Sequence, residues 1–411
     1  MRRRMLQIAW LSVCAASAVL HAQEVTLFGH PLQVHGFASQ GFIYTDNNNW
    51  LTTHSSQGSG AFTDFGFNVS TPINDKFRVG AQIYDRNLGN LGEWHPSFDW
   101  AVADYRFTSW FGIRGGKVKT KRGLYNDTQD LDFIQTFALL PQSIYPTDLR
   151  DATIAHLGGD IYGSIPLWTR AGDLSYTAYA GHRSDSIYSG YPYLLTQFGT
   201  HFKRYGGLQY GVDLRWHTPL KGLLLGVSRM DEDISGKGTS VDQFNPGGGS
   251  IPYSEYSRAD WTNQYYGEYA RNKLQIASEY RRYFRDQMIF GGTSENPIDV
   301  RGWYVSGAYR VVKRLQLGTY YSHYTVSSFV KGLLASFAPV PGPASLPANH
   351  VYDKVVTARV EINRYWDVKV EGHFINGYGN APYPEGFYPQ VNPNGFKPDT
   401  NALVIRTGFN F

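Results

Sequence analysis

Cysteine is nearly absent from this sequence. The one cysteine, Cys14, lies in an N-terminal stretch laid out like a secretory signal peptide. MRRRM is positively charged, LQIAWLSVCAASAVL is an uncharged run, and Leu20-His21-Ala22 offers a cleavage site. Val13 is bulky where a lipoprotein signal has a small residue, which disfavours lipid attachment at Cys14. We expect residues 1–22 to be removed and 23–411 to form one exported domain without disulfide bonds.

Long hydrophobic runs and an excess of one charge are absent as well. The expected mature chain contains no run of 18 apolar residues, which excludes a membrane-spanning helix. Without the three arginines at positions 2–4, 35 of the 38 Lys and Arg residues remain against 34 Asp and Glu. This balance gives no indication of a nucleic-acid partner. A membrane, if one is involved, must be crossed by strands.

Aromatic residues and glycine are abundant, with 30 Tyr, 24 Phe, 10 Trp and 44 Gly. Apolar and polar residues alternate along much of the chain, which is typical of β-strands with two different faces. In the stretch 366–374, Trp366, Val368, Val370 and Phe374 share one face, and Asp, Lys, Glu and His share the other. The fold class is therefore predicted to be all-β.

This alternation predicts sixteen strands. Their ranges are 32–44, 61–72, 77–85, 98–106, 110–118, 153–163, 173–183, 205–216, 221–233, 260–270, 273–285, 301–311, 315–325, 351–362, 366–377 and 401–411. Short turns alternate with long loops, and the long loops are expected at 45–60, 86–97, 119–152, 184–204, 234–259, 286–300, 326–350 and 378–400. An even number of strands with alternating short and long connections is typical of an outer-membrane barrel.

Apolar and polar residues also alternate along the strands of a soluble β-sandwich. The C-terminal sequence helps to distinguish a membrane barrel from such a sandwich. The chain ends in LVIRTGFNF, where Leu403, Ile405, Phe409 and Phe411 share one face. Such an aromatic-ended strand resembles the signal by which bacterial outer-membrane barrels are recognised for assembly, and the resemblance gives Phe409 and Phe411 that role. We therefore predict a transmembrane antiparallel β-barrel of about 16 strands in the outer membrane of a Gram-negative bacterium. Strands cross lipid only as a closed barrel, because every backbone group must be paired.

The third long loop has an unusual composition. Bases come first, then acids, then the apolar run FIQTFALLPQSIY. The layout resembles the sixteen-stranded bacterial porins, whose third loop lies inside the barrel and narrows the channel. The stretch GGKVKTKRGLYNDTQDLDF…LLPQSIY is also similar to one in the phosphate-selective porin superfamily. We expect the loop to fold into the lumen and to form a constriction, with bases on one side and acids on the other, from Lys117, Lys119, Lys121, Arg122, Asp127, Asp130 and Asp132. The alternative is a solvated outward loop whose charges balance one another.

Other charged residues fall on the polar faces of predicted strands. A charge facing lipid costs roughly 2–4 kcal/mol for Arg or Lys at mid-membrane, so these residues are expected to face the lumen. The predicted pore wall consists of Arg114, Arg215, Arg281, Arg359, Lys369, Arg406, Glu279 and Glu371. Arg359 with Glu361 and Lys369 with Glu371 are expected to form ion pairs along the wall.

These patterns favour a passive diffusion channel for small hydrophilic solutes or ions, weakly anion-leaning or unselective. A phosphate- or sugar-selective porin is less favoured, because the lumen carries both signs of charge. A structural or adhesive barrel with a closed lumen remains the alternative. No G-x-S-x-G or H-E-x-x-H motif is present, so no enzyme, metal or cofactor is predicted. Membrane lipid, lipopolysaccharide and the barrel-assembly machinery are the expected partners, and the porin resemblance implies a homotrimer.

Overall fold

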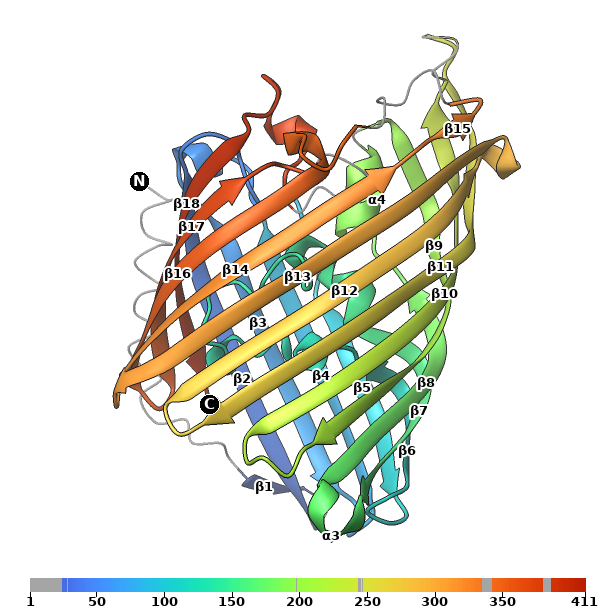
Figure 1. Ribbon diagram of the computed structural model, residues 1–411. Helices are drawn as coiled ribbons and strands as arrows, with labels where there is room; N and C mark the ends of the chain where they lie inside the picture. The colour runs from blue at the N-terminus through green and yellow to red at the C-terminus, as the bar shows by residue number, and fades with distance from the viewer. Residues whose placement is uncertain are drawn as a thin grey trace.

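Long antiparallel strands make up most of the structure, a computed structural model (Figure 1). It describes residues 24–27, 29–196, 198–242, 245, 247–334, 342–379 and 386–411. The predicted signal peptide, residues 1–22, lies outside these ranges. None of the described helices is long and apolar enough to cross a membrane.

Sixteen strands form a closed ring, each antiparallel to its neighbours. They are β2 (His30–Thr45), β3 (Ser59–Pro72), β4 (Phe77–Leu88), β5 (Ser97–Arg106), β6 (Gly112–Lys119), β7 (Ala155–Pro166), β8 (Asp173–Ser184), β9 (Thr200–His217), β10 (Leu223–Val241), β11 (Ser250–Arg271), β12 (Leu274–Ile289), β13 (Ser294–Val312), β14 (Leu315–Ser328), β16 (His350–Asn363), β17 (Trp366–Asn376) and β18 (Asp399–Asn410). Every predicted strand corresponds to one of these. The prediction of a sixteen-stranded antiparallel barrel is confirmed.

The structure also contains two very short strands and several short helices in addition to the ring. The strands are β1 (Glu24–Leu27), paired with β2, and β15 (Lys331–Gly332), paired with β13. The helices are η1 (Ser55–Gln57), η2 (Asn126–Thr128), η3 (Asp132–Ile134), η4 (Thr147–Leu149), α2 (Arg150–Thr153), α3 (Trp168–Ala171), α4 (Gly190–Thr196), η5 (Phe290–Gly292), η7 (Pro347–Asn349) and η8 (Pro389–Val391).

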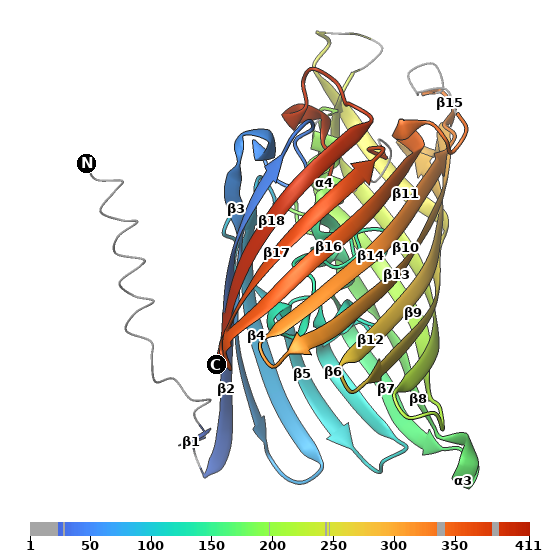
Figure 2. The same cartoon turned by 60° about the vertical axis from the view of Figure 1, so that its left-hand side comes forward.

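The barrel closes where the last strand meets the first strand of the ring. β18 pairs with β2 over nine residues, with Phe409 opposite Ala38. Phe411 extends this contact, because its N–H donates to the carbonyl oxygen of Gly36 at 2.9 Å. The strands are strongly tilted in both views (Figure 2). Closure leaves no free sheet edge in this ring, as a barrel in lipid requires.

Alternation along each strand separates an apolar outer face from a polar inner face. On β17, Val370 and Phe374 are exposed on the outside, whereas Lys369, Glu371 and His373 are buried inside. The alternation predicted from the sequence therefore places these side chains on the correct faces.

Several strands extend further than the sequence indicated. β10 continues to Val241 and β11 begins at Ser250, so the long loop expected at 234–259 shrinks to residues 242–249. Likewise, β12 and β13 leave only residues 290–293 of the loop expected at 286–300. In these extensions the outer face carries charged and polar residues, so apolar and polar residues do not alternate and the sequence pattern did not predict strands. Inside, a cluster that includes Phe202, Tyr205 and Ile234 packs beneath the extensions.

Candidate functional site: a segment across the lumen

The longest connection in the ring joins β6 to β7. We call residues 120–154 the lumen segment; it contains η2, η3, η4 and α2. Its apolar residues Ala138, Leu139, Ile144 and Tyr145 are buried. Leu139 packs in a cluster with Val404 of β18, while Ile144 packs in a cluster with residues of β11 to β13. The segment is drawn in teal within the ring of strands (Figures 1 and 2).

One anchor of the lumen segment is an ion-pair cluster at Asp132. Lys369 Nζ of β17 lies 2.8 Å from Asp132 Oδ1 and donates also to the Asp132 carbonyl oxygen at 2.7 Å. Arg406 Nη1 of β18 lies 3.0 Å from the same carboxylate oxygen. Burial raises the pKa of Asp132, but the positive charges of Arg406 and Lys369 outweigh it and hold this pKa below its ordinary value. The carboxylate is thus ionised and fixed between two strands.

A second anchor is formed by Glu371 of β17. Its carboxylate accepts the backbone N–H groups of Ala138 at 2.9 Å and Leu139 at 3.2 Å. His373 Nε2 lies 3.0 Å from the same carboxylate, and His373 Nδ1 lies 2.7 Å from Asp353 of β16. Because Glu371 and His373 are fully buried, this chain of polar groups holds the segment rigidly.

A third anchor lies on β12. Glu279 accepts the N–H of Leu124 at 3.0 Å and the hydroxyl of Tyr145 at 2.7 Å. Tyr304 donates to it at 2.8 Å. Gly123 has a φ of +60°, and a Cβ there would collide with Gln264 and Glu279. Glycine is favoured at this approach of the backbone to the wall, because a Cβ would strain the backbone and displace the side chains that hold the segment.

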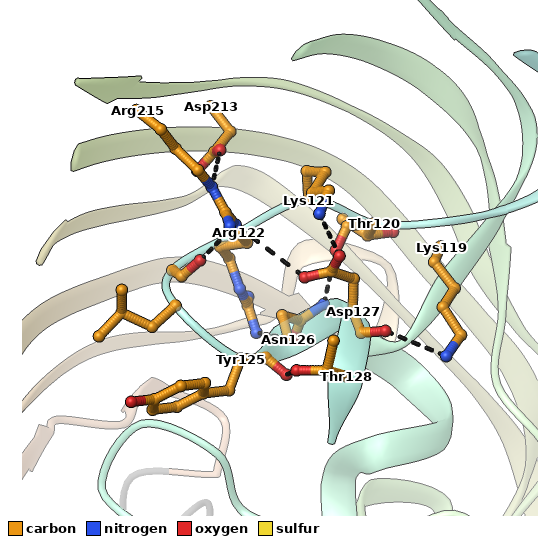
Figure 3. Close-up of polar contacts among 12 residues, drawn as sticks. Lys119, Thr120, Lys121, Arg122, Tyr125, Asn126, Asp127, Thr128, Asp213 and Arg215 are labelled. Atoms are coloured by element: carbon orange, nitrogen blue, oxygen red, sulfur yellow. Dashed lines mark hydrogen bonds and ion pairs between the residues drawn. The ribbon is translucent and has the colours of Figure 1, made fainter. Parts of the chain in front are cut away.

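Four of the seven predicted constriction residues, Lys119, Lys121, Arg122 and Asp127, lie together near the start of the segment (Figure 3). Lys119 Nζ lies 2.7 Å from Asp130, and Lys121 pairs with Asp127. Burial raises the pKa of Asp127, but Lys121 and Arg215 outweigh it and hold this pKa below its ordinary value. The bases therefore do not face the acids across an open gap, as the sequence suggested; they pair directly because all four side chains lie on one short stretch.

Two further bases of the predicted constriction donate hydrogen bonds to neutral groups. Arg122 is buried and donates to Asn126 Oδ1 at 3.3 Å. Lys117, on β6, donates to the carbonyl oxygen of Phe98 at 2.6 Å. Arg122 thus turns into the segment, whereas Lys117 stays on the wall.

The predicted wall arginines hold the lumen segment or pair with acids. Arg281 donates to the Ile144 carbonyl oxygen at 2.9 Å, Arg215 to that of Gly123 at 2.7 Å, and Arg359 to that of Phe133 at 2.6 Å. Arg114 instead pairs with Asp160 at 2.7 Å.

The expected wall pairs are only partly right. Arg359 lies 2.9 Å from Asp367 and 3.9 Å from Glu361, so Asp367 is its main partner. Lys369 pairs with Asp132, and Glu371 accepts from the lumen segment and His373. The predicted ion pair between Lys369 and Glu371 was wrong, because the lumen segment provides a separate partner for each of these side chains.

Free space remains on one side of the lumen segment. A cavity of about 280 Å³ is lined by polar and charged residues of β4 to β6, the segment and the β8–β9 connection, among them Arg86, Asp99, Lys117, Asp151 and Asp185. Three other cavities beside the segment have volumes of about 50, 60 and 20 Å³. Of these four cavities, the largest lies beside β4 to β6.

Sequence reasoning missed part of this cavity lining. Asp99 pairs with Arg150 of α2 at 2.8 Å, and Arg86 pairs with Asp151 at 3.0 Å. In the backbone register of β4 and β5, Gln82 lies opposite Trp100 and Ile83 lies opposite Phe98. Asp99, between Phe98 and Trp100, is therefore the extra residue of a β-bulge. A bulge shifts the alternation, and the period-2 pattern gave no signal for it.

The long-loop end of the barrel is also packed with side chains. Trp50, Leu91, Phe387 and Tyr388 are buried there in the cluster that includes Leu139 of the lumen segment. The Trp50 ring lies 4.9 Å from that of His373. Connections from three parts of the chain thus cover the same mouth.

This protein resembles known proteins in its fold and not in its sequence. No protein-family model and no curated protein matches the sequence. Among solved structures, OmpF of Salmonella typhi, in complex with daunomycin, has a TM-score of 0.54 at 15% identity, over 95% of this chain and 100% of that one. The fold is that of an outer-membrane porin.

Two further porin-like structures cover nearly the whole barrel. The trimer form of OmpT, an outer membrane protein of Vibrio cholerae, has a TM-score of 0.54 at 12% identity, over 93% of this chain and 99% of that one. An anion-selective porin from Comamonas acidovorans has a TM-score of 0.52 at 9% identity, over 93% and 100%. At such low identities the likeness concerns the porin fold.

Proposed function

We propose that this protein is a passive diffusion channel for small hydrophilic solutes or ions in the outer membrane of a Gram-negative bacterium. The observation that carries the proposal is the lumen segment, anchored on β12, β17 and β18, with a polar cavity left beside β4 to β6. An aqueous lumen is what a sixteen-stranded barrel encloses. The porin fold of the solved structures supports the same function.

The lumen segment acts as the constriction of this channel, and its charges leave the pore weakly anion-leaning or unselective. Lys119 is neutralised by Asp130 and Lys121 by Asp127, while Asp132 is held between two bases. Ion selectivity follows the net charge at the narrowest point. With each acid paired, no strong preference for one sign of charge arises.

The proposed assembly is a homotrimer, which the trimer form of the Vibrio cholerae protein supports. Phe409 and Phe411 are proposed to be read by the barrel-assembly machinery. Both lie at the closing seam, where β18 meets β2. No role for nucleic acid is proposed.

A second function is favoured by one observation. Lys369 and Glu371 are fully buried although they face the lumen, and the long-loop mouth is packed with aromatic residues. A barrel filled in this way fits a structural or adhesive protein whose lumen is closed.

Single-channel recording separates the two functions. The full chain, refolded and with its folding checked by heat-modifiable migration, is inserted into a planar bilayer with a salt gradient. Discrete current steps with a small reversal potential are expected for the channel. A silent bilayer with correctly folded protein would refute the channel and support the closed barrel.

A further inference from the structure

Arg122 of the lumen segment is a buried base without an acid. It is only 4% exposed, and within the described chain its guanidinium group makes one hydrogen bond, to Asn126 Oδ1 at 3.3 Å (Figure 3). The same oxygen also accepts from Gln129 at 3.0 Å, and Arg122 Nε has no hydrogen-bond partner. Arg150 and Arg406 are buried as well, but each of them pairs with a carboxylate at 2.8 Å. Of these three buried arginines, Arg122 is the one whose charge is not neutralised.

A buried positive charge of this kind is costly. An ion that leaves water loses its hydration, and a nearby opposite charge is needed to offset that loss. A buried lysine or carboxyl group can give up its charge by releasing or taking up a proton, but arginine stays protonated inside proteins. Arg122 therefore calls for an anion beside it in the folded barrel.

Arg122 lines the cavity of about 60 Å³ between the lumen segment and the wall. Leu149 of the segment, Met230 of β10 and Val300 of β13 line the same cavity. A water molecule needs about 10–15 Å³ of such space, so the cavity holds a ligand about the size of four waters. A small organic anion has this size.

Two further arginines line this cavity, and neither takes part in neutralising Arg122. Arg183 pairs with Asp185 at 2.7 Å and with Glu232 at 2.6 Å, while Arg281 donates to the Ile144 carbonyl oxygen at 2.9 Å. Neither of the two acids forms an ion pair with Arg122 in the described part of the chain. The guanidinium groups add to the positive potential of the space, which attracts an anion.

Asp148 is the remaining acid that lines the cavity. Its Oδ2 accepts the hydroxyl group of Tyr388 at 2.6 Å, and no ion pair joins it to Arg122 among the described residues. Asp148 is therefore engaged by Tyr388 and does not act as the counter-ion of Arg122.

The backbone on both sides of Arg122 is fixed. The N–H of Thr120 donates to the Ile154 carbonyl oxygen at 2.9 Å, and the N–H of Gly123 donates to Ser228 Oγ at 3.1 Å. Arg122 cannot turn toward solvent unless the segment leaves the wall. A guanidinium group held in this way loses little entropy when it binds a ligand.

The lining also indicates the kind of anion. A guanidinium group binds a carboxylate through two parallel hydrogen bonds. The side chains of Leu149, Met230 and Val300 offer no hydrogen-bond donor, so phosphate, with oxygens on every side, would have some of them unpaired there. An anion with one charged end and one apolar end fits better.

We infer that Arg122 binds a small monocarboxylate of the size of acetate as a resident counter-ion. The carboxylate lies on the guanidinium group, and the apolar end packs against Leu149, Met230 and Val300. The bound anion stabilises the lumen segment against the wall. This role goes beyond the proposed channel function and does not depend on whether the lumen conducts.

The test measures the stability of the refolded full-length protein in detergent. Unfolding in urea is followed by tryptophan fluorescence while sodium acetate replaces sodium chloride at constant ionic strength. Acetamide, which has the shape of acetate without its charge, is titrated in parallel. The test variant is Arg122→Gln. The control is Arg310→Gln, because Arg310 on β13 pairs with Glu361 at 3.0 Å and is partly exposed.

The wild type should become more stable in acetate. When acetate is at about ten times its dissociation constant, the equilibrium constant of unfolding should fall about tenfold. Arg310→Gln should respond equally, and acetamide should have no effect. Arg122→Gln should not respond to acetate. In chloride alone it should be at least as stable as the wild type, because it lacks the buried charge.

Three results would overturn the proposal. They are a wild type that does not respond to acetate, an Arg122→Gln variant that responds as the wild type does, and an Arg122→Gln variant that is less stable than the wild type in chloride. The third result would mean that Arg122 already has a partner within the chain. If Arg122→Gln does not fold, equilibrium dialysis of the wild type with radiolabelled acetate decides: one bound acetate per chain is expected, and none would refute the site. Current recordings of the wild type test the channel separately.

Discussion

Asp132 and Lys369 are 237 positions apart in the chain and form a buried ion pair, with 2.8 Å between Asp132 Oδ1 and Lys369 Nζ. The lysine is fully buried and also donates to backbone carbonyl oxygens of Asp132 and Phe137. One side chain of β17 thus fixes both the charged start and the apolar middle of the lumen segment. Replacing a member of such a pair leaves the other charge uncompensated, which is more costly than the pair is favourable.

Replacing Lys369 with Met is expected to loosen the lumen segment. The free energy of unfolding should fall by about 3 kcal/mol, because Asp132 keeps only Arg406 as a close base. Single-channel conductance should rise, and urea unfolding measures the stability. Lys273→Met, at an exposed turn, is the control and should change neither quantity. Unchanged conductance together with lowered stability would mean that the segment does not limit the flow.

Gly123→Ala tests the third anchor. The added Cβ would collide with Gln264 and Glu279, and the φ of +60° is strained for alanine. The expected result is a higher and noisier conductance, because the N–H of Leu124 moves away from Glu279. Gly307→Ala, where a Cβ would meet nothing within 4 Å, should behave like the wild type. A wild-type trace for Gly123→Ala would contradict this account of the anchor.

Charge reversal at Lys119 and Lys121 should change ion selectivity. In Lys119→Glu with Lys121→Glu, four acids replace two ion pairs, because Asp130 and Asp127 lose their lysine partners. The reversal potential in a salt gradient should shift toward cation preference. Lys221→Glu, in the exposed turn between β9 and β10, makes a matched control. If both variants keep the wild-type reversal potential, the lumen segment does not control selectivity.

Acid should release the Asp132 anchor only at low pH. The folded-state pKa of this carboxyl is below its ordinary value of 3.8, so its stabilising effect is complete above that pH. The effect is lost as the pH falls through the folded-state pKa. The part of the conductance change that depends on Asp132 should therefore lie below about pH 4. Asp132→Asn should show the larger conductance already at pH 7 and should lose only this low-pH change. If the low-pH change is the same in Asp132→Asn and in the wild type, this assignment is contradicted.

The sequence predicted the strands better than the site. Val370 and Phe374 alternate with Lys369 and Glu371, so the pattern by itself indicates which side chains face the lipid and which face the lumen. The alternation pattern failed at two places. The β-bulge at Asp99 shifts the alternation, so this inward-facing acid was not predicted. The outer faces of β10 and β11 are polar near the long-loop end, so the extensions of these strands were not predicted either. Arg359 was placed on the inner face, but Asp367 was not identified as its partner.

By itself the sequence determined the number of strands, their two faces and the charged character of the third loop. The reason is that apolar and polar side chains must alternate when one face meets lipid and the other water. Only the tertiary structure decided that Asp132 meets Lys369 and Arg406, and that Glu279 meets Gly123 and its neighbours. These contacts depend on the register and closure of sixteen strands, which bring together residues that no local pattern in the sequence connects.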